Sequence, residues 1–156
     1  MQGDPAVLEL LNDVLTAELT AVNQYFLDAK MFDNWGYAEL AEHFRSESIG
    51  EMKDAEKLID RILYLDGHPN VQRLGVVRTG ETSNEKFALS LDLEREAIER
   101  LNGGIALCVD RGDNGSRALL EEILQGEEGH ADWIETQLHL IGELGEVPYL
   151  AEMIRS

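Results

Sequence analysis

The sequence predicts an all-α protein, a four-helix bundle with one long crossover connection and a short fifth helix at its C-terminal end. Four long stretches carry apolar residues at steps of three and four, which places them on one face of a helix. One of the connections between these stretches is much longer than the others, and no stretch shows the alternation of a strand. With 156 residues and 44% hydrophobic content, we expect a single domain over residues 1–156.

The first two helices are expected to form an antiparallel pair. Asp4 is a capping residue and Pro5 suits the first helical position, so a helix is predicted over residues 5–35. Gly36 ends it, and the next helix, over residues 37–66, starts at once. A connection this short makes the two helices antiparallel neighbours.

Residues 67–82 are predicted to be a long crossover, because they hold several glycines and a proline. Fifteen residues can stretch to about 50 Å, whereas the second helix is about 42 Å long. The connector can therefore cross the whole bundle, which would make the second and third helices parallel.

The remaining helices follow from caps and breaks of the same kind. Thr82 lies in a plausible cap region before a helix predicted over residues 83–111. The next helix is predicted over residues 116–144 and ends at Gly145. A short fifth helix is expected over residues 147–154.

Acidic residues interrupt every apolar stripe near the middle of its helix, and a histidine follows in the fourth. A buried carboxylate costs several kcal/mol unless something compensates it. No Lys or Arg stands in these stripes, so a bound cation is the natural compensator. One Glu from each of two helices, with Glu-x-x-His from the other two, is a di-iron arrangement of four-helix bundles. The candidate metal ligands are Glu18, Glu51, Asp54, Glu94, Glu127 and His130.

Asp54 does not fit this arrangement, because the second helix should offer a histidine three residues after Glu51. Aspartate can bind a metal, but it is shorter and brings another negative charge. Two interpretations stay open. Either Asp54 binds metal directly or through water, with help from Glu47 one turn earlier, or this half of the centre is defective.

Met52 lies about 100° around the helix from the stripe that holds Glu51. With Ile49 and Ile59 it predicts a second, outward-facing apolar surface, which is typical of contact with another subunit. Met52 is therefore either an interface residue or a thioether ligand to haem iron. Tyr25 is expected to donate a hydrogen bond to a ligand carboxylate.

The composition and charge of the chain limit which binding partners and which cellular compartment we expect. A formal charge of −18 repels nucleic acid phosphates, so no nucleic acid is expected as a partner. No apolar run reaches about 18 residues, and no membrane span is expected. Cys108 is the single cysteine, which fits a reducing compartment, and residues 1–5 show no secretory signal. We therefore expect a cytoplasmic protein.

Several motifs together are similar to those of the bacterioferritin family over essentially the full length. The longest matches are Glu18-Leu-Thr-Ala-Val-Asn-Gln-Tyr25-Phe26, Glu47-Ser-Ile-Gly-Glu51-Met52-Lys53, Asp66-Gly-His-Pro-Asn70 and Glu127-Glu-Gly-His130-Ala-Asp-Trp-Ile-Glu-Thr-Gln-Leu138.

This resemblance implies the ferritin-like fold and an iron-storage shell of about 24 subunits. It implies that Glu18, Glu51, Glu94, Glu127 and His130 form a ferroxidase centre, which oxidises Fe(II) with oxygen or peroxide. It also implies haem b between two subunits, with Met52 from each side as the axial ligand, and a small electron-donor protein for iron release.

The sequence departs from the family pattern at position 54, which is normally histidine. Ser46 and Gly50 also replace a His and an Asp that some members use for an inner-surface iron site. An alternative function is therefore a haem-bearing subunit with an impaired centre that co-assembles with an active subunit. A rubrerythrin-like peroxidase is disfavoured by the single cysteine, and a DNA-protecting mini-ferritin by ligands that lie within one subunit.

Overall fold

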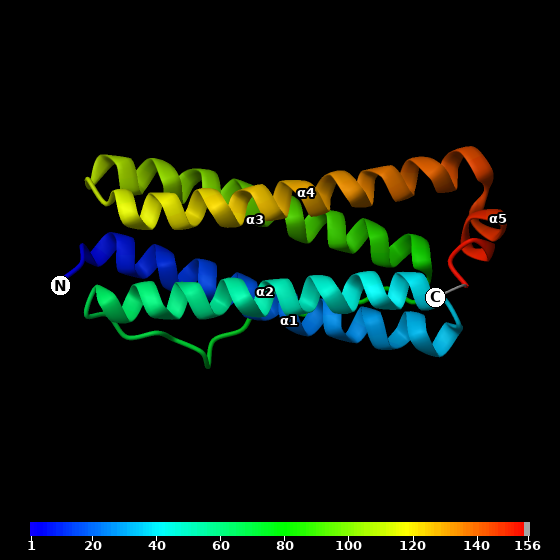
Figure 1. Cartoon of the computed structure of the whole chain (residues 1–156), viewed down its shortest axis with the longest axis horizontal. Helices are drawn as coiled ribbons and strands as arrows, with labels where there is room; N and C mark the ends of the chain where they lie inside the picture. Colours follow the sequence, from blue (N-terminus) through cyan, green and yellow to red (C-terminus); the bar gives the residue numbers. More distant parts are fainter. Residues whose placement is uncertain (155–156) are drawn as a thin grey trace.

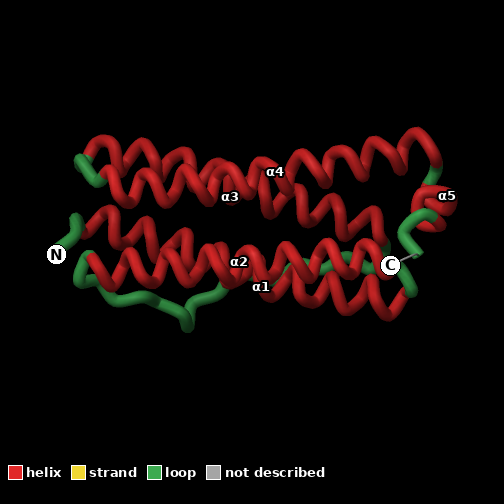
Figure 2. Tube along the Cα trace, in the orientation of Figure 1, coloured by secondary structure: helices red, strands yellow, loops and turns green. Residues whose placement is uncertain are grey.

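A computed structural model describes residues 1–154, so that positions 155 and 156 of the predicted domain lie outside the described residues. Within residues 1–154 the chain forms helices and loops and no strand, which confirms the all-α prediction (Figures 1 and 2). The helices are α1 (Pro5–Trp35), α2 (Ala38–Tyr64), α3 (Ser83–Asp110), α4 (Asn114–Leu144) and α5 (Glu146–Ala151).

Caps that the sequence predicted determine where α1 and α3 begin. The Asp4 side chain accepts hydrogen bonds from the backbone N–H groups of Ala6 and Val7, at 2.8 and 3.2 Å. These bonds satisfy donors that have no partner inside the helix. Thr82 caps α3 in the same way by accepting from the backbone N–H of Glu85 at 3.1 Å.

Gly36 ends α1 with a φ of 90°, a left-handed conformation that glycine adopts without strain. The chain therefore turns back at once, and α2 runs antiparallel beside α1 (Figure 1). The following loop crosses the full length of the bundle before α3 begins, so α2 and α3 are parallel and α4 returns antiparallel to α3 (Figure 2).

All helix ends lie within three residues of the predicted ranges; α2 spans Ala38–Tyr64 rather than residues 37–66, and α3 ends at Asp110 rather than at residue 111. Two of the differences have clear local reasons. Helix α4 starts at Asn114, two residues early, because the Asp113 side chain accepts from the backbone N–H of Ser116 at 3.0 Å. Helix α5 ends at Ala151 rather than at residue 154. The N–H groups of Glu152 and Met153 bond to carbonyls only three residues back, which tightens the chain into turns.

The crossover is held against α1 by polar side chains that recur every fourth residue along that helix. We call this row the polar ladder. Its oxygens accept from crossover groups at 2.8 to 3.2 Å, three of them backbone N–H groups. Positions four apart lie on one side of a helix, so a single row can follow an extended segment. The ladder consists of Asn12, Thr16, Thr20, Gln24 and Asp28.

The last residue of the ladder forms a buried ion pair. Asp28 and Lys86 have side chains 1% and 0% exposed, and the Lys86 ammonium lies 2.9 Å from an Asp28 oxygen. The same ammonium donates to Thr79 Oγ1 at 2.6 Å and lies 3.1 Å from Met31 Sδ. Burial raises the pKa of the Asp28 carboxyl, and the hydrogen bonds from Lys86 and Thr79 partly offset that rise. The pair joins α1, the crossover and the first turn of α3.

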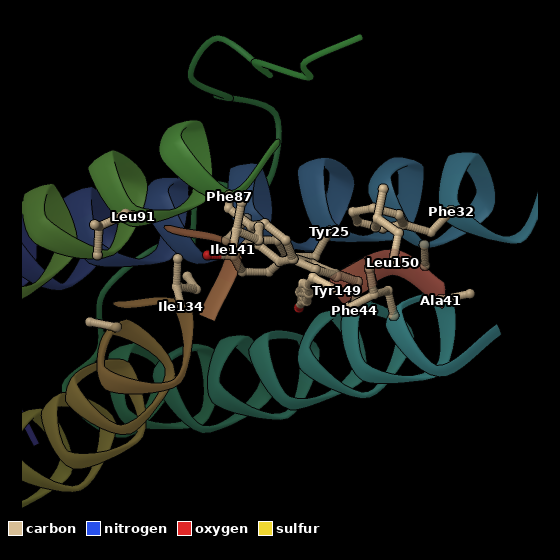
Figure 3. Packing of buried hydrophobic residues seen from close by; sticks show 14 residues of the cluster. Tyr25, Phe32, Ala41, Phe44, Phe87, Leu91, Ile134, Ile141, Tyr149 and Leu150 are labelled. Carbon is tan, nitrogen blue, oxygen red and sulfur yellow. The ribbon is translucent and has the colours of Figure 1, made fainter. Parts of the chain in front are cut away.

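Two apolar clusters fill the bundle, one on each side of a polar layer. The aromatic half surrounds Tyr25, Phe32, Phe44, Phe87 and Tyr149, which Figure 3 shows packed against one another. The aliphatic half consists of side chains from the opposite ends of the same four long helices. Its largest fully buried members are Leu11, Leu15, Leu58, Ile62 and Leu101.

Candidate metal centre

Carboxylates from three helices meet in the polar layer. Oxygen atoms of Glu18 on α1, Glu51 and Asp54 on α2, and Glu127 on α4 all lie within 4.8 Å of one another. The three glutamates are 2 to 4% exposed, whereas Asp54 is only partly buried. The structure therefore brings these four candidate ligands together at one level of the bundle.

Glu94 extends this group from α3 and is 1% exposed. Its Oε1 accepts a hydrogen bond from the Tyr25 hydroxyl and lies 3.2 Å from His130 Nδ1. Its carboxyl group is also hydrogen-bonded to that of Glu127. Burial alone would raise the pKa of Glu94, but these hydrogen bonds and the neighbouring imidazole hold it below its ordinary value. We call Glu18, Glu51, Asp54, Glu94 and Glu127 the carboxylate cluster.

The pKa values of the other carboxyls in the cluster are shifted upward. Burial, followed by repulsion from neighbouring carboxylates, raises the pKa of Glu18 well above its ordinary value. Burial is also the largest cause of the raised pKa values of Glu51 and Glu127. Burial raises the pKa of Asp54 to about 6, although Lys57 opposes it. The raised pKa values mean that these carboxyls bind protons more readily than free carboxyls do, and a divalent cation would compete with those protons.

Several atoms that could bind a metal are buried but have no hydrogen-bond partner among the described residues. They comprise one oxygen each of Glu18, Glu51 and Glu94, together with His130 Nε2. A buried polar atom without a partner costs free energy that coordination to a metal would recover. Oxygen donors with one imidazole suit iron, manganese or zinc, so the residues present fit such an ion.

A cavity of about 230 Å³ reaches the carboxylate cluster from the side of α1 and α3. Its wall includes the buried Glu18 and Glu94 and, farther out, the exposed side chains of Arg78 and Glu96. The crossover residue Gly75 also lines it. The cavity therefore connects the buried donors with more exposed residues beneath the crossover.

A second group of donors also includes His130, whose Nδ1 lies 3.7 Å from Glu47 Oε2. One atom each of His43, Glu47 and His130 lies within 4.8 Å of the other two. Burial, and secondly the neighbouring His130, lowers the pKa of His43 to about 3. Sequence reasoning considered Glu47 but missed His43. The available signal was the spacing of four residues from His43 to Glu47 and again to Glu51 on one face of α2.

Met52 lies apart from both groups of donors and is 46% exposed, whereas the preceding Glu51 is 4% exposed. Phe26 and Ile49 are also about half exposed. Ile49 and Met52 therefore form an outward apolar surface on α2, as the sequence indicated, but Ile59 is partly buried and packs against the aliphatic half. The role of Met52 as a haem ligand stays a prediction.

Known proteins match this chain in sequence over nearly its whole length. A model of the ferritin-like domain matches residues 8–144. The bacterioferritin of Mycobacterium leprae is 54% identical over 154 residues, which cover 99% of this chain and 97% of that protein. The chain belongs to the bacterioferritin family. Bacterioferritin BfrA of Mycobacterium tuberculosis and the bacterioferritin of Streptomyces coelicolor are each 53% identical over 154 residues. Those residues cover 97% and 92% of the two relatives.

Membership in the bacterioferritin family connects the chain with iron storage. No helix of residues 1–154 combines the length and the apolar character that a membrane crossing requires. The ligand roles of the individual cluster residues stay predictions, now supported by the distances above.

Proposed function

We propose that the chain binds two Fe(II) ions at the carboxylate cluster and oxidises them to Fe(III). The product is stored as ferric mineral inside a hollow shell of about 24 copies. One observation carries the proposal. Five carboxylates converge in the core, four of them almost fully buried, and the described structure supplies no Lys or Arg against the four buried ones.

The contacts within the cluster suggest how two ions would be held. An oxygen of Glu51 lies within 4.8 Å of oxygens of both Glu18 and Glu127. Glu127 lies near both Glu51 and Glu94. Central carboxylates of this kind suit a bridging role between metals about 3.5–4 Å apart. Glu18 with Asp54 would then complete one iron site, and Glu94 with His130 the other.

The same donors favour oxidation of the bound iron. Anionic ligands stabilise Fe(III) more than Fe(II), because the additional positive charge is compensated locally. Two Fe(II) ions release two electrons, which reduce oxygen to hydrogen peroxide with two protons, or hydrogen peroxide to two water molecules with two protons. The carboxyls with raised pKa values release their protons as iron binds.

Asp54 motivates a second candidate function. It is partly buried and stands where the family pattern has histidine. Aspartate is shorter than histidine and adds a further negative charge, so this half of the centre would bind iron weakly. A haem-bearing subunit with a slow centre, assembled with a competent second subunit, is the alternative.

The exposed apolar surface around Met52 fits a contact between two copies of the chain. Ile49, one turn before Met52, would bury apolar area there, and a thioether from each copy would hold haem b. Haem at this position supplies a route for electrons from a small donor protein when stored iron is released.

Stopped-flow mixing of the metal-free shell with Fe(II) and oxygen tests the ferroxidase proposal. The near-ultraviolet absorbance of ferric iron should show a fast phase of about two irons per chain. Glu127→Gln should slow this phase about 100-fold, because it removes an anionic bridge. Glu128→Gln on the exposed side of the same turn is the matched control and should behave as wild type. A wild-type shell without a fast phase would favour the impaired subunit instead.

A further inference from the structure

We propose that His43, Glu47 and His130 form an additional binding site for one divalent transition-metal ion, beside the carboxylate cluster. The proposal goes beyond the ferroxidase centre, because His43 and Glu47 belong to none of the ligands assigned to it. Only His130 is common to both sites.

The distances between the donor atoms suit a metal. His43 Nε2 lies 3.9 Å from Glu47 Oε1, and His130 Nδ1 lies 3.7 Å from Glu47 Oε2. Two ligands on opposite sides of a metal with bonds of about 2.1 Å are about 4.2 Å apart. Both distances fall below that limit, so small side-chain movements would place the donors around one ion.

The second observation is that these imidazoles have donor atoms without partners. His43 Nε2 and His130 Nε2 are buried and accept or donate no hydrogen bond within residues 1–154. The His130 side chain is 1% exposed, so bulk water does not compensate it. Each unsatisfied buried nitrogen costs free energy that a hydrogen bond or a metal would recover.

Aromatic neighbours hold both imidazoles in place. The His43 ring stacks on Trp133 with centroids 3.4 Å apart and an interplanar angle of 12°. The edge of Tyr25 packs against His130 at 5.1 Å, and Phe44 contacts both imidazoles at 5.3 and 5.9 Å. A donor set that is fixed before binding loses little side-chain freedom when the metal arrives.

The donor types indicate which ions the site would take. Two imidazoles and one carboxylate with open positions suit Fe(II) and Zn(II). This set carries one negative charge, whereas the carboxylate cluster offers five carboxylates, so the additional site would hold a divalent ion more weakly. His130 Nδ1 lies 3.2 Å from Glu94 Oε1 and 3.7 Å from Glu47 Oε2, so an iron ion that leaves Glu94 has the next donors within reach.

Co(II) and Zn(II) are suitable probes, because both bind imidazole and neither is oxidised in the assay. The complete metal-free shell would be crystallised, soaked with either ion, and examined by anomalous diffraction. Co(II) absorption in solution would be titrated in parallel. His43→Gln removes the proposed nitrogen ligand and keeps a polar side chain. His139→Gln, an exposed histidine on the same helix as His130, is the matched control.

The proposal predicts an anomalous peak within about 2.5 Å of both a His43 nitrogen and a Glu47 oxygen. His43→Gln should abolish this peak and leave density in the carboxylate cluster, and His139→Gln should keep both. No peak at His43 in wild type, or a peak that persists in His43→Gln, would overturn the proposal. A peak at His43 with an empty carboxylate cluster would instead contradict the proposed di-iron centre, so the two failures are distinguishable.

Discussion

Two regions of this molecule bury charge in opposite ways. Asp28 is paired with Lys86, which lies 2.9 Å away and is completely enclosed. The carboxylate cluster buries more acids in the middle of the bundle, and the pKa of Glu18 and its neighbours rises as a result. The first region contains its own cation, and the second does not.

The comparison separates a structural use of buried charge from a functional one. An ion pair that is complete within the chain fixes geometry and needs no ligand. A cluster that is left incomplete stores free energy that only an added cation or proton releases. If the two regions differ in this way, added metal should stabilise the carboxylate cluster and have no effect on the Asp28–Lys86 pair.

Lys86→Ala should produce the largest effect, because it leaves Asp28 buried and unpaired. We expect a loss of about 3–5 kcal/mol in the free energy of unfolding, measured by chemical denaturation of the metal-free protein. Added Zn(II) should stabilise wild type and Lys86→Ala equally, so the difference between them should stay the same. Lys30→Ala removes an exposed lysine and should change stability little. Equal effects of the two variants would show that the ion pair has no special structural role.

Metal binding should stabilise the second region and not the first. Zn(II) at about 100 times its Kd should add about 2.7 kcal/mol of stability per site, visible as a higher Tm. Glu51→Gln should lose most of this gain, because Glu51 contacts carboxyls on both of its sides. Glu56→Gln, exposed on the same helix, should keep it. An unchanged Tm in wild type on addition of metal would refute the cation requirement.

The metal-free protein should lose stability as the pH rises from about 4 to 7. The folded pKa of Asp54 is about 6, compared with an ordinary value of 3.8, so the folded state binds the proton more tightly. Stability from this group is present below pH 3.8 and is lost as the pH rises through 6. We expect about 1–2 kcal/mol from Asp54 after allowance for its partial exposure.

Denaturation of wild type and Asp54→Asn at both ends of this pH range isolates the contribution of Asp54. The variant should be more stable than wild type at pH 7, with little difference at pH 4. A wild-type protein that gains stability over the same range would contradict the direction of the shift.

Asp54→His should give the smallest effect, a change in the rate of iron oxidation at the carboxylate cluster. Histidine reduces the negative charge and supplies the imidazole that the family pattern has at this position. We expect the fast phase of iron oxidation to accelerate about 3- to 10-fold, a change of about 1 kcal/mol in the barrier. Glu56→His, on the exposed side of α2, controls for an added histidine. No acceleration would mean that Asp54 already serves as an adequate ligand.

The sequence predicted the all-α architecture and the convergence of its buried acids, because helical periodicity and mid-helix position are local properties. A hydrogen bond from Tyr25 to one of the ligand carboxylates was also expected; the structure shows it to Glu94, a partner that the sequence did not identify. His43 was missed because its partners His130 and Trp133 come from another helix. Lys86 was missed for the same reason, since its pairing with Asp28 depends on packing between α1 and α3.

The polar ladder on α1 has a further consequence for how the chain is routed. Successive residues of an α-helix are rotated by about 100°, so a step of four overshoots a full turn by about 40°. Four such steps, from Asn12 to Asp28, carry the row about 160° around α1. The crossover follows this row. It therefore passes from the side of α1 near the end of α2 to the side near Lys86, in the first turn of α3. The helical twist of α1 thus sets the path of the crossover and the position at which α3 begins.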